Sequence, residues 1–232
     1  MTPPVELAGF SVVATGAFNP AIFHPLWFGD KELLPENAIQ DALGKEFVAL
    51  RQLAAYTADW LSVQVTLEQA VFSTVDEGRE FDLRDLVKGV LDLLPETPVN
   101  ALGLNADAHF RVESETAWHA IGDRFLPKDF WQPIFEGDEW KRRPDGLSVG
   151  MRSITVEAWR EDIPGYVRTE VAPSVRLTPN GVYTGINAHF QLTTPDERGN
   201  AYMAARIIED HWDATRDLER ELIRRILEQT HE

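Results

Sequence analysis

One short sequence pattern occurs twice in this chain, and it limits the folds that the chain can adopt. Residues 185–192 read GINAHFQL and residues 103–112 read GLNADAHFRV, so both contain G-[IL]-N-A followed by H-F, with two extra residues in the earlier copy. In the earlier copy hydrophobic and polar residues alternate, which is typical of a strand with one buried face. A helical pattern follows each copy. We therefore predict an internally duplicated fold with two related halves.

Further strands are expected on both sides of the chain's midpoint. Leu61, Val63 and Val65 alternate with polar residues, which predicts a half-buried strand. The Asn180–Gly181 pair between two β-rich runs is a strong hairpin signal, so the strands around it should be antiparallel neighbours. Together with the preceding run, these strands are expected at residues 147–160, 166–177 and 182–193.

Helices are expected after several of these strands. Residues 82–94 place leucine and valine on one stripe, with Asp82 as the N-cap, and Ser114 is expected to cap a second helix. The longest helical pattern covers residues 200–229. Trp118 and Trp212 each lie on the helix that follows a copy of the repeated strand, so we expect them to be equivalent core residues in the two halves.

These elements predict an α+β fold: a curved, mostly antiparallel sheet with helices packed on one face, internally duplicated, and ending in a long C-terminal helix. The polar, turn-rich segment 136–146 is the expected junction between the halves. The N-terminal half would cover residues 1–140 and contain the first repeat, residues 61–126. The C-terminal half would cover residues 141–232, and the two would form one fused globular unit.

The net charge of −16 over 232 residues restricts the partners of this chain. Such a charge repels phosphate backbones and anionic lipid surfaces, so nucleic-acid binding is unlikely and membrane binding is not expected. It favours a basic protein partner, and the long C-terminal helical pattern could dock onto a partner or onto a second copy of this chain, so self-association is the alternative. The chain has no cysteine, which excludes disulfides and thiolate chemistry. The first residues do not resemble an export signal, so we expect a cytoplasmic protein.

The candidate ligand-binding residues are the polar positions of the two repeated strands. If the strands lie near each other about a pseudo-twofold axis, these side chains could converge on the face opposite the core and bind a small molecule or a metal ion. The simpler interpretation is structural, because an exposed strand face must be polar and such residues can hold a neighbouring loop. No cofactor is expected and no metal ligand is assigned. The residues are Asn105, Asp107, His109, Asn187 and His189.

Two motifs with catalytic associations occur in unfavourable contexts. Residues 146–150 match G-x-S-x-G, but the residues that follow Ser148 read as a strand, and a nucleophile elbow requires a helix there. Glu139 and Lys141, with Asp129 upstream, imitate the acidic and lysine elements of metal-dependent nucleases. This second motif lies in an expected loop of an acidic chain. No catalytic residue is therefore assigned.

The two repeated strands, the segment IGDRFLPKDFW at residues 121–131 and the strand GMRSITVE at residues 150–157 carry a resemblance. With these motifs the chain resembles a sporadically distributed family of uncharacterised bacterial proteins. The resemblance implies no specific activity; its patchy distribution suggests an accessory bacterial system, such as defence or toxin control.

Two functional hypotheses follow from the sequence. The first is a non-catalytic, acidic protein-interaction or regulatory protein. The alternative is an enzyme or a small-molecule or metal-binding module that uses the Asn/His face of the repeated strands.

Overall fold

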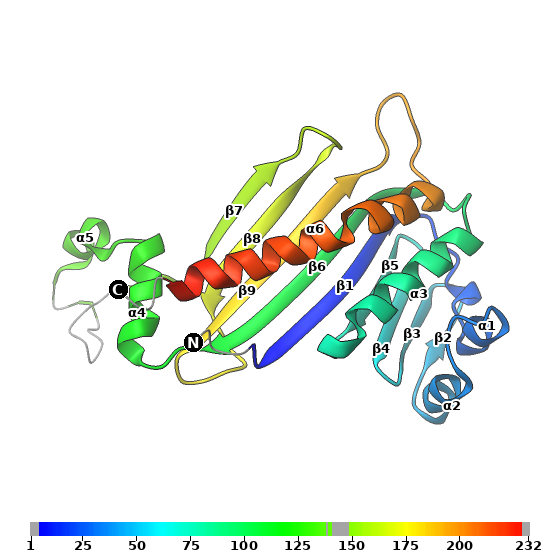
Figure 1. The fold of residues 1–232 in the computed structure, drawn as a ribbon, viewed down its shortest axis with the longest axis horizontal. Helices are drawn as coiled ribbons and strands as arrows, with labels where there is room; N and C mark the ends of the chain where they lie inside the picture. Colours follow the sequence, from blue (N-terminus) through cyan, green and yellow to red (C-terminus); the bar gives the residue numbers. More distant parts are fainter. Residues whose placement is uncertain (1–4, 138, 141–148, 229–232) are drawn as a thin grey trace.

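The computed structural model describes residues 5–137, 139–140 and 149–228, and one antiparallel sheet organises this part of the chain (Figure 1). The sheet has nine strands in the order β2-β3-β4-β5-β1-β6-β9-β8-β7, and it does not close, so β2 and β7 form its edges. The strands are β1 (Leu7–Gly16), β2 (Val48–Ala49), β3 (Leu53–Ala58), β4 (Leu61–Thr66), β5 (Gln69–Thr74), β6 (Val99–Arg111), β7 (Ile154–Trp159), β8 (Gly165–Pro173) and β9 (Gly181–Gln191).

Helices cover one face of this sheet. In Figure 1, α3 and the long helix α6 cross the same face of the strands. Buried residues of both helices and of the strands form one hydrophobic cluster, so this face is the core side. This arrangement confirms the predicted α+β class and the long C-terminal helix. The helical elements are η1 (Pro20–Ile22), α1 (Pro25–Asp30), α2 (Glu36–Gly44), η2 (Glu77–Arg79), α3 (Glu80–Leu93), α4 (Glu115–Phe125), α5 (Lys128–Trp131), η3 (Gln132–Phe135) and α6 (Ala201–Glu228).

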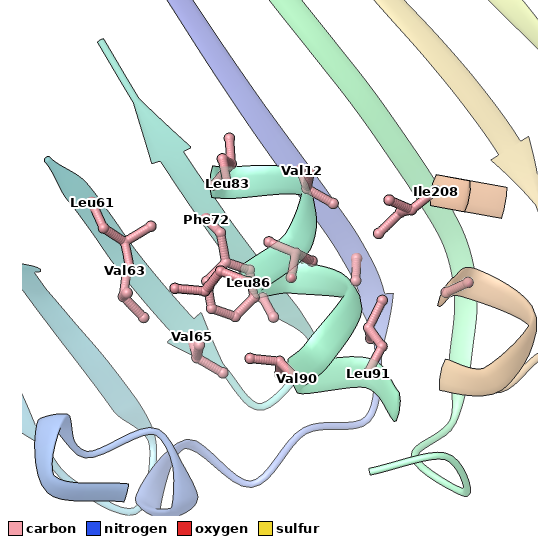
Figure 2. Close-up of a cluster of buried hydrophobic side chains, with 14 of the residues drawn as sticks. Val12, Leu61, Val63, Val65, Phe72, Leu83, Leu86, Val90, Leu91 and Ile208 are labelled. Carbon is pink, nitrogen blue, oxygen red and sulfur yellow. The ribbon is translucent and has the colours of Figure 1, made fainter. Parts of the chain in front are cut away.

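The main hydrophobic cluster forms where α3 packs on the strands of the first half of the chain. Alternate residues of β4 point toward the helix, and the helical stripe that includes Leu83, Leu86 and Val90 meets them (Figure 2). Leu83 and Val65 are completely buried. Burial of a leucine or valine side chain contributes about 1.5–3 kcal/mol, so this contact fixes α3 on the sheet.

A second, smaller cluster lies around Phe110, Val171 and Val182, and α6 contributes to both clusters. The N-terminal part of α6, including Ile208 and Trp212, packs in the main cluster, whereas its C-terminal part packs in the smaller one. The helix therefore ties the two clusters together. The buried residues of its last turns are Ile223, Ile226 and Leu227.

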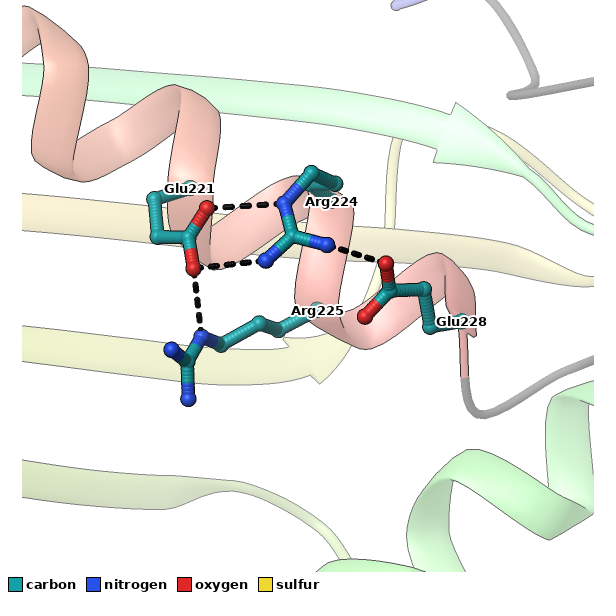
Figure 3. A network of polar contacts seen from close by, with 4 residues as sticks. All are labelled: Glu221, Arg224, Arg225 and Glu228. Atoms are coloured by element: carbon teal, nitrogen blue, oxygen red, sulfur yellow. Dashed lines mark hydrogen bonds and ion pairs between the residues drawn. The ribbon is translucent and has the colours of Figure 1, made fainter.

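The exposed side of the last turns of α6 carries a network of ion pairs (Figure 3). Arg224 donates to both carboxylate oxygens of Glu221 at 2.7 Å, Arg225 donates to the same carboxylate at 2.6 Å, and Arg224 also contacts Glu228. Arg224 and Arg225 hold the pKa of Glu221 at about 2. These pairs are three or four residues apart, the spacing at which side chains meet on a helix.

Most predicted local features are confirmed, with corrections at the ends of elements. The three strands of the second half are antiparallel neighbours, and Ser114 caps α4 by accepting a hydrogen bond from Ala117. Asp82 was the wrong cap: α3 begins at Glu80, and Asp76 caps the preceding turn instead. The strand predicted at residues 147–160 begins only at residue 154, and its first two residues lie outside the described part of the chain.

Strands β6 and β9, the two copies of the repeated pattern, are hydrogen-bonded neighbours with Asn105 directly opposite Asn187. The duplication of whole halves is not shown, because the elements that follow the copies differ. α6 crosses the sheet, whereas α4 lies beyond the end of the strands (Figure 1). Trp212 is buried in the main cluster, but Trp118 is half-buried and donates to the Gly181 carbonyl at 2.9 Å. The division at residue 140 stays a prediction.

Candidate functional site

The face of the sheet opposite α3 and α6, called the open face below, carries the predicted ligand-binding residues. In β6 and β9 the residues on either side of each asparagine are buried on the core side, so the asparagines point to the open face. The strand register places one polar residue from each of five adjacent strands in a single line. These residues, from β7 to β1, are Glu157, Arg168, Asn187, Asn105 and Ser11.

A groove of about 170 Å³ lies in the middle of the open face. Gly185 forms its floor, and the register places this glycine directly between Asp107 on β6 and Glu170 on β8. A side chain at this position would collide with the Tyr183 hydroxyl, so the glycine makes room for the Tyr183 side chain, which lies over it. The lining residues that bear polar side chains are Asn105, Asp107, Arg168, Glu170, Tyr183 and Asn187.

The two asparagines form a short hydrogen-bonded chain along one wall of this groove. Asn187 Nδ2 donates to Asn105 Oδ1 at 2.5 Å, and Asn105 Nδ2 donates to the Ser11 hydroxyl at 3.2 Å. Asn187 Oδ1 is buried and has no hydrogen-bond partner within the described residues. The chain therefore ends in an acceptor that an N–H or O–H donor could satisfy.

The electrostatic character of the groove is set by its two carboxylates. Glu157 pairs with Arg168 at 2.7 Å, and the Arg168 guanidinium lies 4.9 Å from the centre of the Tyr166 ring, so this positive charge is already engaged. Asp107 and Glu170 remain as negative groups on the strands on either side of Gly185, and the Asp107 carboxylate leans over Gly9 of β1. Burial, followed by the charges of these two carboxylates, raises the pKa of Tyr183, so its hydroxyl stays protonated at neutral pH.

His109 lies beside the groove, in a structural position. Its ring is buried, and Nδ1 lies 2.8 Å from the Ser174 hydroxyl oxygen in the β8–β9 loop. That oxygen already accepts the backbone N–H groups of Arg176 and Leu177, so the hydroxyl hydrogen is directed at Nδ1. The imidazole proton is then on Nε2, 3.6 Å from Asp107. His109 therefore holds the loop, as the simpler interpretation expected.

His189 lies on the other side of the asparagine pair. It stacks on Tyr166 with ring centres 4.7 Å apart, and its register partner on β6 is Gly103. His109 lies six residue steps along the strand from Gly103, or about 20 Å at the rise of an extended strand. The predicted convergence of the two histidines is thus not found. Among the described residues, no group of three or more His, Asp or Glu side chains could hold a metal ion.

The structure brings together Asn105, Asp107 and Asn187 from the predicted set, and it adds three residues that the sequence analysis missed. Arg168, Glu170 and Tyr183 reach the groove from β8 and β9. In the sequence these residues alternate with residues of the core side, and this alternation is a signal of the face on which they lie. It could place them on the open face, but only the register of the β8–β9 hairpin brings them beside Asp107.

The two motifs with catalytic associations cannot be assembled from the described residues. Ser148 and Lys141 both lie outside them. Asp129, the upstream acid of the second motif, lies in the short helix α5 rather than on a strand. Adjacent strands are the context that the nuclease chemistry requires.

Comparisons with known proteins do not assign the chain to a family. Neither a scan against protein-family models nor a search of curated proteins found a match. Within the described residues, every helix is too short or too polar to span a bilayer.

Proposed function

We propose that this chain is a non-catalytic interaction protein that binds a basic side chain of a protein partner in the open-face groove. The observation that carries this proposal is the placement of Asp107 and Glu170 on either side of the Gly185 floor. A lysine ammonium that reaches the Tyr183 hydroxyl over this floor is attracted by the charge of both carboxylates, and the hydroxyl is a further acceptor.

The charge of the whole chain supports the same kind of partner. A net charge of −16 attracts a basic protein over several ångströms and accelerates its association, with the effect reduced by salt. Neighbouring groups favour binding over chemistry. His109, the imidazole next to the groove, is engaged by Ser174 and is not presented to a ligand.

The test is to remove both carboxylates of the groove without changing its shape. We expect Asp107→Asn combined with Glu170→Gln to weaken binding of fluorescein-labelled octalysine about tenfold or more, measured by fluorescence anisotropy at moderate salt. Each replacement leaves a neutral amide, so the electrostatic part of the site is lost.

A control pair of variants separates the groove from the overall charge. Glu96→Gln combined with Glu161→Gln makes the same change in net charge at exposed positions away from the groove. If this control weakens octalysine binding as much as the groove variant, the binding is a general property of an acidic surface and the proposal fails.

A second occupant is favoured by one observation: in the part of the chain that the structure describes, Asn187 Oδ1 has no hydrogen-bond partner. A small free amine could donate to this oxygen from within the groove. Titration with spermidine distinguishes the two: saturable spermidine binding that Asn187→Ala abolishes, but that Asp107→Asn with Glu170→Gln leaves unchanged, would favour a small-molecule-binding module.

A further inference from the structure

The two edges of the sheet differ in length. The β2 edge has two residues, Val48–Ala49, and so offers little to pair with, whereas β7 has six, Ile154–Trp159. Proteins usually protect an exposed edge by shortness, lysine, proline or a bulge. We propose that β7 is a docking site at which an extended, basic segment of a protein partner adds a tenth strand to the sheet.

The hydrogen-bonding of β7 shows which backbone groups face outward. The Arg160 amide donates to the Gly165 carbonyl at 3.2 Å, so this opposed pair is a hydrogen-bonded one. Because hydrogen-bonded and non-hydrogen-bonded pairs alternate, the residues that bond β8 are Ile154, Val156 and Ala158. The N–H and C=O groups that point away from the sheet are those of Thr155, Glu157 and Trp159.

The side chains of β7 do not protect this edge. The segment contains no lysine, arginine or proline, and its charged residue, Glu157, is paired with Arg168. Trp159 on the open face is 76% exposed, and Val156 on the core side is 55% exposed. Both apolar side chains would be covered by a strand added at this edge.

Charge selects a basic segment rather than a second copy of this chain. Pairing two copies would bring together two chains that each carry −16, whereas a basic segment reduces the charge. The added strand would present alternate side chains on the open face, opposite Thr155, Glu157 and Trp159. A lysine or arginine opposite Glu157 or over Trp159 is favourable. This inference rests on the proposed function, from which it takes the positive charge of the partner. The exposed edge of β7 is the reason for the partner's extended conformation.

Proline at Thr155 tests the strand addition directly. Thr155 is exposed and its N–H faces outward, so Thr155→Pro removes one donor to the incoming strand and leaves the bonds to β8 intact. The matched control, Thr155→Val, keeps the donor. The probe is a labelled peptide in which lysine and valine alternate, compared with a peptide of the same composition in separate lysine and valine blocks.

We expect the alternating peptide to bind more tightly than the block peptide by fluorescence anisotropy. Thr155→Pro should weaken it about tenfold, whereas Thr155→Val should change it by less than about twofold. Trp159→Lys is a second variant that leaves the backbone unchanged; it sets a like charge against the peptide and should weaken it similarly. Circular dichroism confirms that each variant is folded.

Three results would overturn the inference. Equal binding of both peptides, or an alternating peptide insensitive to both edge variants, would show that β7 is not used. A dimer in the absence of peptide, abolished by Thr155→Pro, would mean that the edge serves a second copy.

The groove is tested separately: if Asp107→Asn with Glu170→Gln leaves octalysine binding unchanged while the edge variants still weaken the alternating peptide, the groove proposal fails and the edge stands.

Discussion

Arg216 and Glu219 form a buried ion pair on α6, with Arg216 Nη1 and Glu219 Oε2 3.1 Å apart. Only 4% of Arg216 and 7% of Glu219 is exposed. The guanidinium lies 4.7 Å from the centre of the Phe10 ring on β1, which gives it a cation–π contact. Along the helix, the pair lies between Trp212 in the main cluster and Ile223 in the smaller one, so a polar region separates the two hydrophobic clusters.

Removing one member of this pair should lower the free energy of unfolding more than removing both. Arg216→Met leaves Glu219 buried without its partner, and we expect a loss of about 3–5 kcal/mol in the free energy of unfolding. Arg216→Met combined with Glu219→Leu removes both charges and should recover most of that loss. Urea denaturation measures the free energy of unfolding of the single and double variants. A double variant as unstable as Arg216→Met would show that the unpaired charge of Glu219 is not the cause of the loss.

Glu219 should also make stability depend on pH. Burial is the main cause that raises its pKa to about 7; Arg216 and Arg220 lower it, while Asp107 and Glu80 raise it. Between about pH 4.5 and 7 the folded protein keeps a proton that the unfolded chain has lost. Raising the pH through this range should therefore destabilise the protein, by at most about 1.4 kcal/mol per pH unit. Glu219→Gln should be less sensitive over the same range, and parallel curves for the two proteins would contradict this.

The asparagine pair should be energetically coupled. Asn187→Ala leaves the Asn105 carbonyl oxygen without its donor, and we expect a loss of about 1–2 kcal/mol. In a double-mutant cycle with Asn105→Ala, the coupling energy should be about 0.5–1.5 kcal/mol. Strictly additive effects in chemical denaturation would mean that the contact contributes nothing to stability.

His109 should hold the β8–β9 loop most firmly in its neutral form. Burial lowers the pKa of His109, so the unfolded chain takes up a proton before the folded protein does. Its contribution to stability is therefore present above about pH 6.5 and is lost as the pH falls below that value. We expect His109→Ala to speed proteolysis within residues 174–180 at pH 8, and to reduce the loss of stability on acidification. Unchanged proteolysis would show that His109 does not hold the loop.

Gly165 should not tolerate a side chain. Its φ of +157° is disfavoured for other residues, and an added Cβ would collide with the His189 carbonyl. We expect Gly165→Ala to destabilise the protein by about 1–3 kcal/mol or more in thermal or urea unfolding. Gly44→Ala is the matched control, because an added Cβ there meets open space. Equal effects of the two substitutions would contradict the prediction.

The sequence was sufficient for features that depend on local alternation or on a repeated pattern. It predicted β6 and β9 as related strands, and the structure pairs them with Asn105 opposite Asn187. It could not show that β1 lies between β5 and β6, because strand order depends on contacts between residues far apart in the chain.

The error over the histidines has a simple geometric cause. In an antiparallel pair that is centred on Asn105 and Asn187, residues that follow the asparagine in one strand move away from those that follow it in the other. His109 and His189 therefore lie on opposite sides of the centre. The pairing of β8 with β9 places Glu170 beside Gly185, and no repeat in the sequence predicts this neighbour.

The double role of α6 has a consequence for how this protein is made. Every strand of the sheet precedes α6 in the chain, yet this helix supplies part of both hydrophobic clusters. During synthesis on a ribosome, the strands therefore emerge with apolar surface that only the later helix can cover. Until then, this apolar surface is exposed on the nascent chain, where it favours aggregation.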